Sequence, residues 1–408
     1  MTLLAIRSVR VIDGTGRTIE RATVIIRGAM IAAVGSDRDL SIPRGAIKID
    51  GRGLTLLPGL IDCHVHFCLG AEPDVVGAIA KETPALNLLK ASRAARETLE
   101  AGFTTVRDVG ARDHSIFTLQ QAIKTGLVQG PRIIGAGLAI CMIGGHARFI
   151  GQEVQGVKQV RSAVREQIAA GADVIKVIAS GGVLTPRTSP DQAQMTIEEL
   201  RAAVEEAQLA GRKVAAHAHG SSGMKNAILA GVHSIEHATL MDVEAATLMK
   251  QHGVFMVPTL TALATTASCR LGCGVPDSVR DKAAAMTKRH AVSFKKALRD
   301  GIQIAMGTDA GTPFNFHGEN AQELERMVAF GMSPMQAILA STSSAARLIG
   351  IQDQVGTIEK GKLADLLLFK GNPLRHIEQL HDRDRMVGVI QAGRFVAGLL
   401  KKTINDKQ

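Results

Sequence analysis

Residues 58–67 read PGLIDCHVHF, a short apolar run that ends in two histidines separated by one residue. Side chains two apart on an extended strand point to the same side, so His64 and His66 would face one spot at the strand's end. Either these histidines are polar residues at the mouth of a buried strand, or they are half of a metal site. The rest of the chain decides between the two.

This run is the first of a series of short β-prone runs, which read GLIDCHV, FTTVRDV, RIIGAGL, ADVIKVIAS, KVAAHAH, VHSIEHA, VFMVPTL and IQIAMGTD. Stretches with helical spacing separate them, and several end in glycine, as in VRSAVREQIAAG and FKKALRDG. A glycine there supplies the left-handed cap that ends a helix. Thr196 and Glu199 have the spacing of a capping box. Strands that are apolar on both faces and alternate with helices predict an α/β fold with a parallel sheet.

Eight such units over roughly 300 residues favour a (β/α)8 TIM barrel. A doubly wound sheet is the alternative, but it would want a glycine-rich phosphate loop after its first strand, and none is present. Both chain ends instead contain short strands joined by glycine turns, such as ATVIIRG and MVGVIQAGRFVAG. Because termini commonly lie close together, we expect a composite β-sandwich domain from residues 1–57 and 356–408, beside a barrel domain at 58–355.

Composition narrows the possible partners. The net charge is +10 over 408 residues, but the basic residues are scattered among acidic ones and aromatic residues are scarce, so we expect no nucleic acid partner. No apolar stretch approaches the ~20 residues of a membrane helix, and the N-terminal residues lack a signal peptide's apolar core. We therefore expect a cytoplasmic protein with no membrane partner. We also expect a homo-oligomer.

The cysteine pattern favours free thiols. Five cysteines are an odd number without paired CxxC spacing, and buried free thiols are the expectation in a cytoplasmic protein. Cys269 and Cys273 are four residues apart, so a disulfide or a zinc knuckle at this pair is the alternative.

Imidazole and carboxylate side chains end several of the predicted strands. In a TIM barrel the catalytic residues project from the carboxyl ends of the strands. The residues at such ends are His64, His66, His217, His219, His237 and Asp309. A single histidine there is more often a structural residue than a ligand, and Asp309 alone could cap the next helix. Their convergence on one barrel mouth, however, predicts a site for zinc or a similar divalent metal.

Lys176 lies inside the apolar run VIKVIAS of the fourth predicted strand. Burial disfavours its charged form, and nearby metal cations would disfavour it further. A deprotonated lysine can instead capture carbon dioxide as a carbamate, an anionic ligand with two oxygens that can bridge two metals. The alternative is a lysine that extends its ammonium to solvent.

These residues resemble the metal-dependent amidohydrolase superfamily over nearly the full chain. The resemblance is carried by HVH after the first strand, the lysine on the fourth, histidines ending the fifth and sixth, TD on the eighth, and the tail GTIEKGKLADLLLFKGNPL. Within the superfamily, CMIGGH and IKVIASGGV look closest to the imidazolonepropionase-like branch, specifically its Xaa-Pro dipeptidase and amino-acid carboxypeptidase members.

The resemblance implies two divalent metal ions, expected to be zinc. The more buried ion would be held by His64, His66 and Asp309, the more exposed ion by His217 and His237, and carboxylated Lys176 would bridge the two. His146 and His219 would stay unligated and would polarise or hold the substrate. Many relatives carry a tyrosine two residues after the fifth-strand histidine, where this chain has His219. Because the chain has no tyrosine, that phenol contact must be absent or replaced.

The implied reaction is hydrolysis of an amide, in a peptide or an N-acyl amino acid, with release of a C-terminal amino acid. A metal-bridging hydroxide would attack the carbonyl, and Asp309 would pass its proton to the departing nitrogen. The small-molecule substrate would carry a carboxylate near the scissile amide, and Arg148 or Arg187 could clamp it. The alternatives are hydrolysis of a lactone, cyclic amide or phosphoester on the same site, and a non-catalytic homologue.

Overall fold

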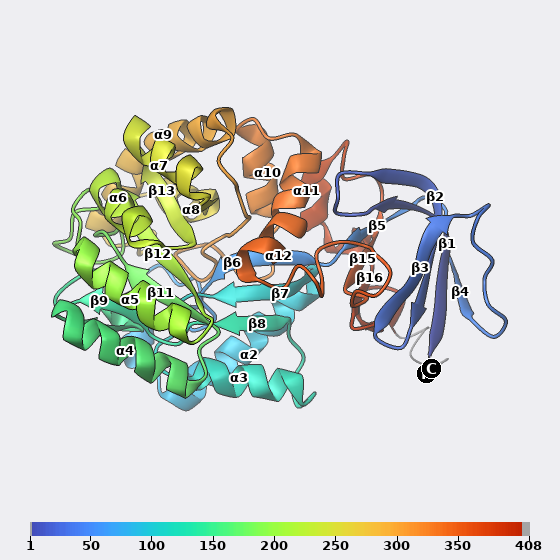
Figure 1. Cartoon of the computed structure of the whole chain (residues 1–408), viewed down its shortest axis with the longest axis horizontal. Helices are drawn as coiled ribbons and strands as arrows, with labels where there is room; N and C mark the ends of the chain where they lie inside the picture. Colours follow the sequence, from blue (N-terminus) through green and yellow to red (C-terminus); the bar gives the residue numbers. More distant parts are fainter. Residues whose placement is uncertain (1, 402–408) are drawn as a thin grey trace.

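The computed structural model describes residues 2–401 (Figure 1). In this range, strands from both chain ends form one sheet. Its order is β17-β16-β15-β5-β1-β2-β3, and β4 pairs with β1. These strands are β1 (Leu3–Ile12), β2 (Thr18–Arg27), β3 (Met30–Ser36), β4 (Ile47–Asp50), β5 (Leu54–Pro58), β15 (Leu366–Lys370), β16 (Met386–Gln391) and β17 (Arg394–Ala397).

Strand β15 connects the two ends by pairing antiparallel with β5. Alternate side chains of this sheet, among them Leu4, Val24, Leu56, Leu366 and Ile390, pack in a common hydrophobic cluster, because residues two apart on a strand share a face. In Figure 1 the blue N-terminal strands and the red strands β15 and β16 lie side by side at the right. The two ends thus share one sheet and one core.

The middle of the chain alternates strands with helices, as the sequence predicts. One parallel sheet holds β6 (Leu60–Val65), β7 (Phe103–Asp108) and β8 (Arg132–Gly135). A second has the order β10-β9-β11-β12-β13-β14, and its strands are β9 (Ala139–Met142), β10 (Gly151–Val154), β11 (Val174–Ile178), β12 (Lys213–Gly220), β13 (Ser234–Leu240) and β14 (Phe255–Val257). The α/β class follows from this alternation.

The eighth predicted run, residues 302–309, is irregular. Ile304 bridges to Met256 of β14 and Ala310 bridges to Val65 of β6, both in parallel. The backbone N–H of Asp309 donates to the carbonyl of His64 at 2.7 Å. Asp309 itself has a left-handed φ of 61°, a conformation that interrupts extended backbone. This segment therefore lies between β14 and β6 without forming a continuous strand.

Helices pack around these strands (Figure 1). They are α1 (Val75–Lys81), α2 (Pro84–Glu100), α3 (Ser115–Lys124), α4 (Gly156–Ala170), α5 (Ile197–Leu209), α6 (Ser221–Ala230), α7 (Val243–His252), α8 (Leu260–Ser268), α9 (Asp277–Asp300), α10 (Gln322–Ala329), α11 (Pro334–Ala340) and α12 (Ser343–Ile349). The predicted capping box at Thr196 and Glu199 is present at the start of α5. Gly171 and Gly301 end α4 and α9 in the left-handed conformation, as their position after the last helical turn predicts.

One cysteine prediction is wrong. Cys269 and Cys273 form a disulfide, because the loop between α8 and α9 turns back on itself and brings the two together. Cys63, Cys68 and Cys141 are free and buried, as expected.

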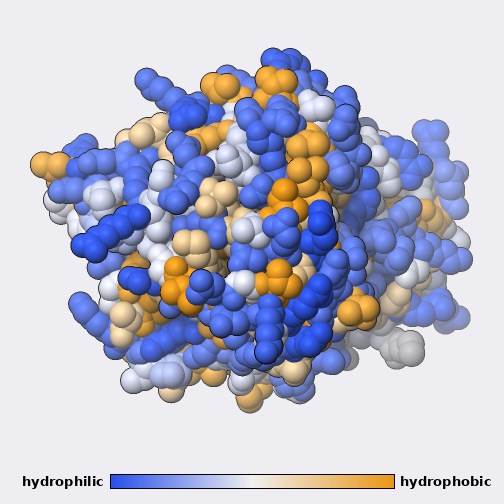
Figure 2. Space-filling model, turned by 60° about the vertical axis from the view of Figure 1, so that its left-hand side comes forward, coloured by the Kyte–Doolittle hydropathy of each residue, from blue (hydrophilic) through white to orange (hydrophobic). Residues whose placement is uncertain are grey.

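The face in Figure 2 is largely hydrophilic, with apolar patches between hydrophilic residues. Exposed large apolar residues are spread over many elements, for example Leu209 at the end of α5 and Leu271 after α8, which is ordinary for a protein surface. Among the described helices, none combines the length and the apolar character needed to cross a membrane.

Candidate metal centre and active site

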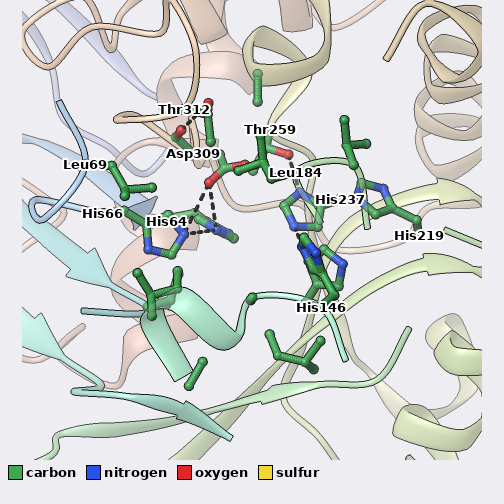
Figure 3. Close-up of a pocket in the computed structure, with 18 of the residues that line it drawn as sticks. His64, His66, Leu69, His146, Leu184, His219, His237, Thr259, Asp309 and Thr312 are labelled. Atoms are coloured by element: carbon green, nitrogen blue, oxygen red, sulfur yellow. Dashed lines mark hydrogen bonds and ion pairs between the residues drawn. The ribbon is translucent and has the colours of Figure 1, made fainter. Parts of the chain in front are cut away.

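A pocket with an empty volume of about 680 Å³ opens where β6, β11, β12 and β13 end (Figure 3). Its lining includes every residue that the sequence assigned to the metals or to carbonyl polarisation, namely His64, His66, His146, Lys176, His217, His219, His237 and Asp309. These residues are far apart in sequence. They meet because parallel strands direct their carboxyl ends to the same side.

His64, His66 and Asp309 form the first group of candidate ligands. His64 Nε2 and His66 Nε2 are 3.3 Å apart, and each lies 3.3 Å from Asp309 Oδ1. Ligands about 2.1 Å from a tetrahedral ion are themselves about 3.4 Å apart. The three atoms therefore have the spacing of neighbours around one small divalent ion, and the residues fit the predicted metal.

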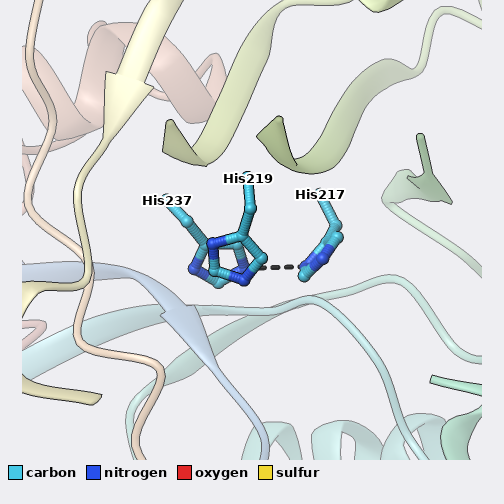
Figure 4. Close-up of side chains that lie close together, drawn as sticks. All are labelled: His217, His219 and His237. Carbon is cyan, nitrogen blue, oxygen red and sulfur yellow. Dashed lines mark hydrogen bonds between the residues drawn. The ribbon is translucent and has the colours of Figure 1, made fainter. Parts of the chain in front are cut away.

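His217, His219 and His237 form the second group (Figure 4). His237 Nε2 lies 2.9 Å from His217 Nδ1, and all three side chains are buried. The sequence assigned only His217 and His237 to a metal, whereas the structure places a third nitrogen donor, from His219, within the same group. In Figure 3 His237 and His219 lie across the pocket from His64 and His66.

The outer nitrogen of each histidine is held by another group. His66 Nδ1 donates to the carbonyl of Gly110 at 2.8 Å, and His217 Nε2 donates to that of Gly181 at 3.2 Å. His237 Nδ1 and His219 Nδ1 lie 2.7 Å and 2.8 Å from the hydroxyls of Thr259 and Thr239, respectively. Such contacts set which ring nitrogen is free to bind a metal.

Glu236 and Arg107 complete this outer layer, and the sequence analysis missed both. Glu236 Oε2 accepts from His64 Nδ1 at 2.8 Å, and Glu236 Oε1 accepts from Arg107 Nη2 at 2.8 Å. Glu236 and Arg107 are 0% and 2% exposed. A glutamate within the apolar run VHSIEHA and an arginine within FTTVRDV were the available signals, because a buried charge needs a partner.

The electrostatics of the pocket suit metal binding. Burial and the neighbouring histidines lower the pKa values of His217, His219 and His237 well below the usual range, so these rings are neutral, as ligation requires. Burial alone would raise the pKa of Asp309, but the charges and hydrogen bonds of His64 and His66 outweigh it and lower that pKa. The aspartate is therefore a carboxylate at neutral pH.

Lys176 lies on β11 and lines the same pocket. It is 2% exposed, so the alternative of a side chain that reaches solvent does not hold. Burial lowers its pKa to about 8. Among residues 2–401, its side-chain Nζ has no hydrogen-bond or ion-pair partner. Lys176 thus brings an amine to the same pocket that both groups of candidate metal donors line.

The remaining candidates have different surroundings. His146 is buried, its Nδ1 lies 2.9 Å from Thr185 Oγ1, and burial lowers its pKa to about 3. Arg148 and Arg187 are exposed and do not belong to the residues that line the pocket. Their role as a carboxylate clamp stays a prediction.

Comparisons with known proteins identify the family. Residues 55–396 match the amidohydrolase family. The fold superposes with a TM-score of 0.91 on a Xaa-Pro dipeptidase that has methionine bound in its active site, with 38% identity over 97% of this chain and 100% of that one. Ochratoxinase from Aspergillus niger is 32% identical, covering 95% of this chain and 85% of the ochratoxinase. An imidazolonepropionase from Shouchella clausii is 25% identical over 95% and 89% of the two chains.

These relatives include the branch that the sequence motifs indicated, and the alternating strands and helices of this chain have the fold of its amidohydrolase neighbour. The family match covers most of the chain, and the pocket holds two groups of metal donors. The chain therefore belongs to the amidohydrolase family, as a metal-dependent hydrolase that acts on C–N bonds.

Proposed function

We propose that this protein cleaves the amide bond of a peptide or an N-acyl amino acid and releases a C-terminal amino acid, with two divalent ions bound in the pocket. The observation that carries this proposal is the position of Lys176, a buried and unpaired amine, in the same pocket as the triangle of His64, His66 and Asp309 and the pair His217 and His237.

We propose that Lys176 is carboxylated. A neutral lysine amine adds to carbon dioxide and loses one proton, which gives a carbamate with one negative charge. Its lowered pKa makes the neutral amine accessible near neutral pH. The carbamate would be the ligand common to both ions. The ions, expected to be zinc, would lower the pKa of water so that a nucleophile forms near neutral pH, and would polarise the scissile carbonyl.

The chain's own residues would position the substrate and move the proton. His237 Nε2 and His217 Nδ1 lie 2.9 Å apart, and the family resemblance supports these two residues as ligands. We therefore assign them to the metal and leave His219 and His146 to hold or polarise the carbonyl. Asp309, which stays ionised, would accept the proton of the attacking water and deliver it to the departing nitrogen. Without this transfer the nitrogen would leave as a poor, anionic group.

The walls of the pocket support an apolar substrate side chain. They are formed by Leu69, Val109, Phe149, Ile150, Ile178, Val183, Leu184, Ala262 and Leu263. An apolar wall of this kind favours aliphatic or aromatic groups over charged ones. The methionine bound in the active site of the similar Xaa-Pro dipeptidase is a ligand of that class, which supports release of an apolar amino acid here.

We also propose that the central strands close into a barrel. The parallel bridges Met256–Ile304 and Val65–Ala310 support a (β/α)8 barrel at residues 58–355 that closes through the irregular eighth run. The shared sheet of the two chain ends supports a separate β-sandwich domain at 1–57 and 356–408.

A substrate library tests the function. Dipeptides and N-acyl amino acids would be incubated with zinc-loaded and with chelator-stripped protein, and amino acid release would be measured. We expect release only with metal, and faster release of leucine, methionine or phenylalanine than of aspartate or lysine. No release across the library by protein with two bound metals would refute the proposal and direct attention to lactones, cyclic amides or phosphoesters.

A further inference from the structure

The loop that follows β11 forms one wall of the pocket. Val183 and Leu184 line the cavity, and the next residue, Thr185, reaches His146. Thr185 Oγ1 lies 2.9 Å from His146 Nδ1 and accepts from the backbone N–H of Ala147 at 3.3 Å. The position of this loop therefore determines both the shape of the apolar wall and the orientation of a candidate substrate-binding histidine.

One side chain from outside the loop holds it in place. Lys282 lies on α9, half-buried, and its Nζ donates to the carbonyls of Thr188 at 2.8 Å, Thr185 at 2.9 Å and Gly182 at 3.4 Å. An ammonium has three protons to donate, so these contacts engage all of them within one loop. Residues 181–189 form no helix or strand. Their carbonyls therefore lack the regular hydrogen bonds of a helix or a sheet and need other donors, such as Lys282.

The same face of α9 also holds the end of β13. His290 Nε2 donates to the carbonyl of His237 at 2.9 Å, and Ser293 Oγ donates to that of Thr239 at 2.8 Å. His237 has a left-handed φ of 72°, which costs a non-glycine residue about 1 kcal/mol or more. Residues 282, 290 and 293 face the same side because they are about two and three helical turns apart. One helix thus fixes a candidate metal ligand and the pocket wall.

We propose that Lys282 is a positioning residue that determines substrate affinity, because it holds residues 182–188 against the pocket so that Leu184 forms the apolar wall and Thr185 orients His146. This role rests on the proposed amidase function. Lys282 itself does not line the pocket, and its three hydrogen bonds go to carbonyls of the loop.

The test compares Lys282→Met, Lys282→Arg and the control Lys288→Met, an exposed lysine on the same helix. Methionine keeps the aliphatic stem but removes the three donors. We expect Lys282→Met to raise KM about tenfold for a substrate with a large apolar side chain, with kcat and bound zinc within about twofold of the wild type. Arginine should recover part of the loss, and Lys288→Met should match the wild type.

Hydrogen exchange supplies a readout that needs no substrate. Amides of residues 182–188 should exchange at least about tenfold faster in Lys282→Met than in the wild type or Lys288→Met, and Thr185→Val should raise KM while leaving Lys282 in place. Unchanged exchange and unchanged KM in Lys282→Met would overturn the proposal. An equal fall of kcat and bound zinc would also overturn it, because that pattern indicates general damage. If the wild type cleaves no amide, the proposed function fails, while the exchange result still decides whether Lys282 holds the loop.

Discussion

Replacing Glu236 by glutamine tests how the metal centre is held. Glutamine preserves the size of the side chain but removes its charge and turns one acceptor oxygen into an NH2 donor. Both oxygens of Glu236 now accept, one from His64 Nδ1 and the other from Arg107 Nη2 and the Ser234 hydroxyl. In the variant a donor must therefore face a donor, and Arg107 is left as a buried charge without its counterion.

Two estimates give the cost. Removing one partner of a buried ion pair typically costs about 3–5 kcal/mol. Burial alone would raise the pKa of Glu236, but Arg107 and His64 outweigh it and lower that pKa from 4.5 to about 2, which corresponds to about 3 kcal/mol. Because the pKa is lower in the folded state, this stabilisation is present above pH 4.5 and is lost as the pH falls towards 2. The loss of His64 orientation should weaken zinc binding by about 10–100-fold.

The assay combines zinc titration against a competing chelator with chemical unfolding of the metal-free protein at pH 7. The control is Glu206→Gln, which removes a carboxylate paired with Arg161 and Arg165 on the outer helices and should leave zinc affinity unchanged. If Glu236→Gln bound zinc with wild-type affinity, Glu236 would not orient His64. If its unfolding free energy were also unchanged, the account of the buried pair would be wrong.

Two further changes probe the site, and a third probes a buried carboxylate outside it. Lys176→Ala should lose bound metal and activity, with partial rescue by a short carboxylic acid that replaces the carbamate; full activity, measured beside the metal content, would exclude a bridging role. Asp309→Asn should lower kcat by about 10²–10⁴-fold, and an unchanged kcat would show that Asp309 does not transfer the proton. Burial raises the pKa of Glu323 from 4.5 to about 7, so the unfolding free energy should decrease as the pH rises from 4.5 to 7. In Glu323→Gln this decrease should be smaller, and an identical pH profile in denaturant titrations would contradict the buried, protonated glutamate.

Local regularities made much of this protein readable from its sequence. Alternating apolar runs and helical stretches predicted the α/β class, since strand and helix periods are properties of the backbone itself. The spacing of His64 and His66 predicted that both face one point, and the structure brings their Nε2 atoms to 3.3 Å. Lys176 was recognisable because a charge inside an apolar strand has no local explanation.

Only the tertiary structure revealed the contacts that support these residues. Glu236 is 172 residues from His64 in sequence, and Lys282 is 97 residues from Thr185. Neither contact can be predicted from the periodicity of a helix or a strand. The left-handed conformations of Asp309 and His237 likewise depend on neighbours in other elements that outweigh the local preference. Residue type and strand period identified the candidate ligands, whereas the packing of distant elements determined how they are oriented, because orientation depends on partners that the chain brings together only when it folds.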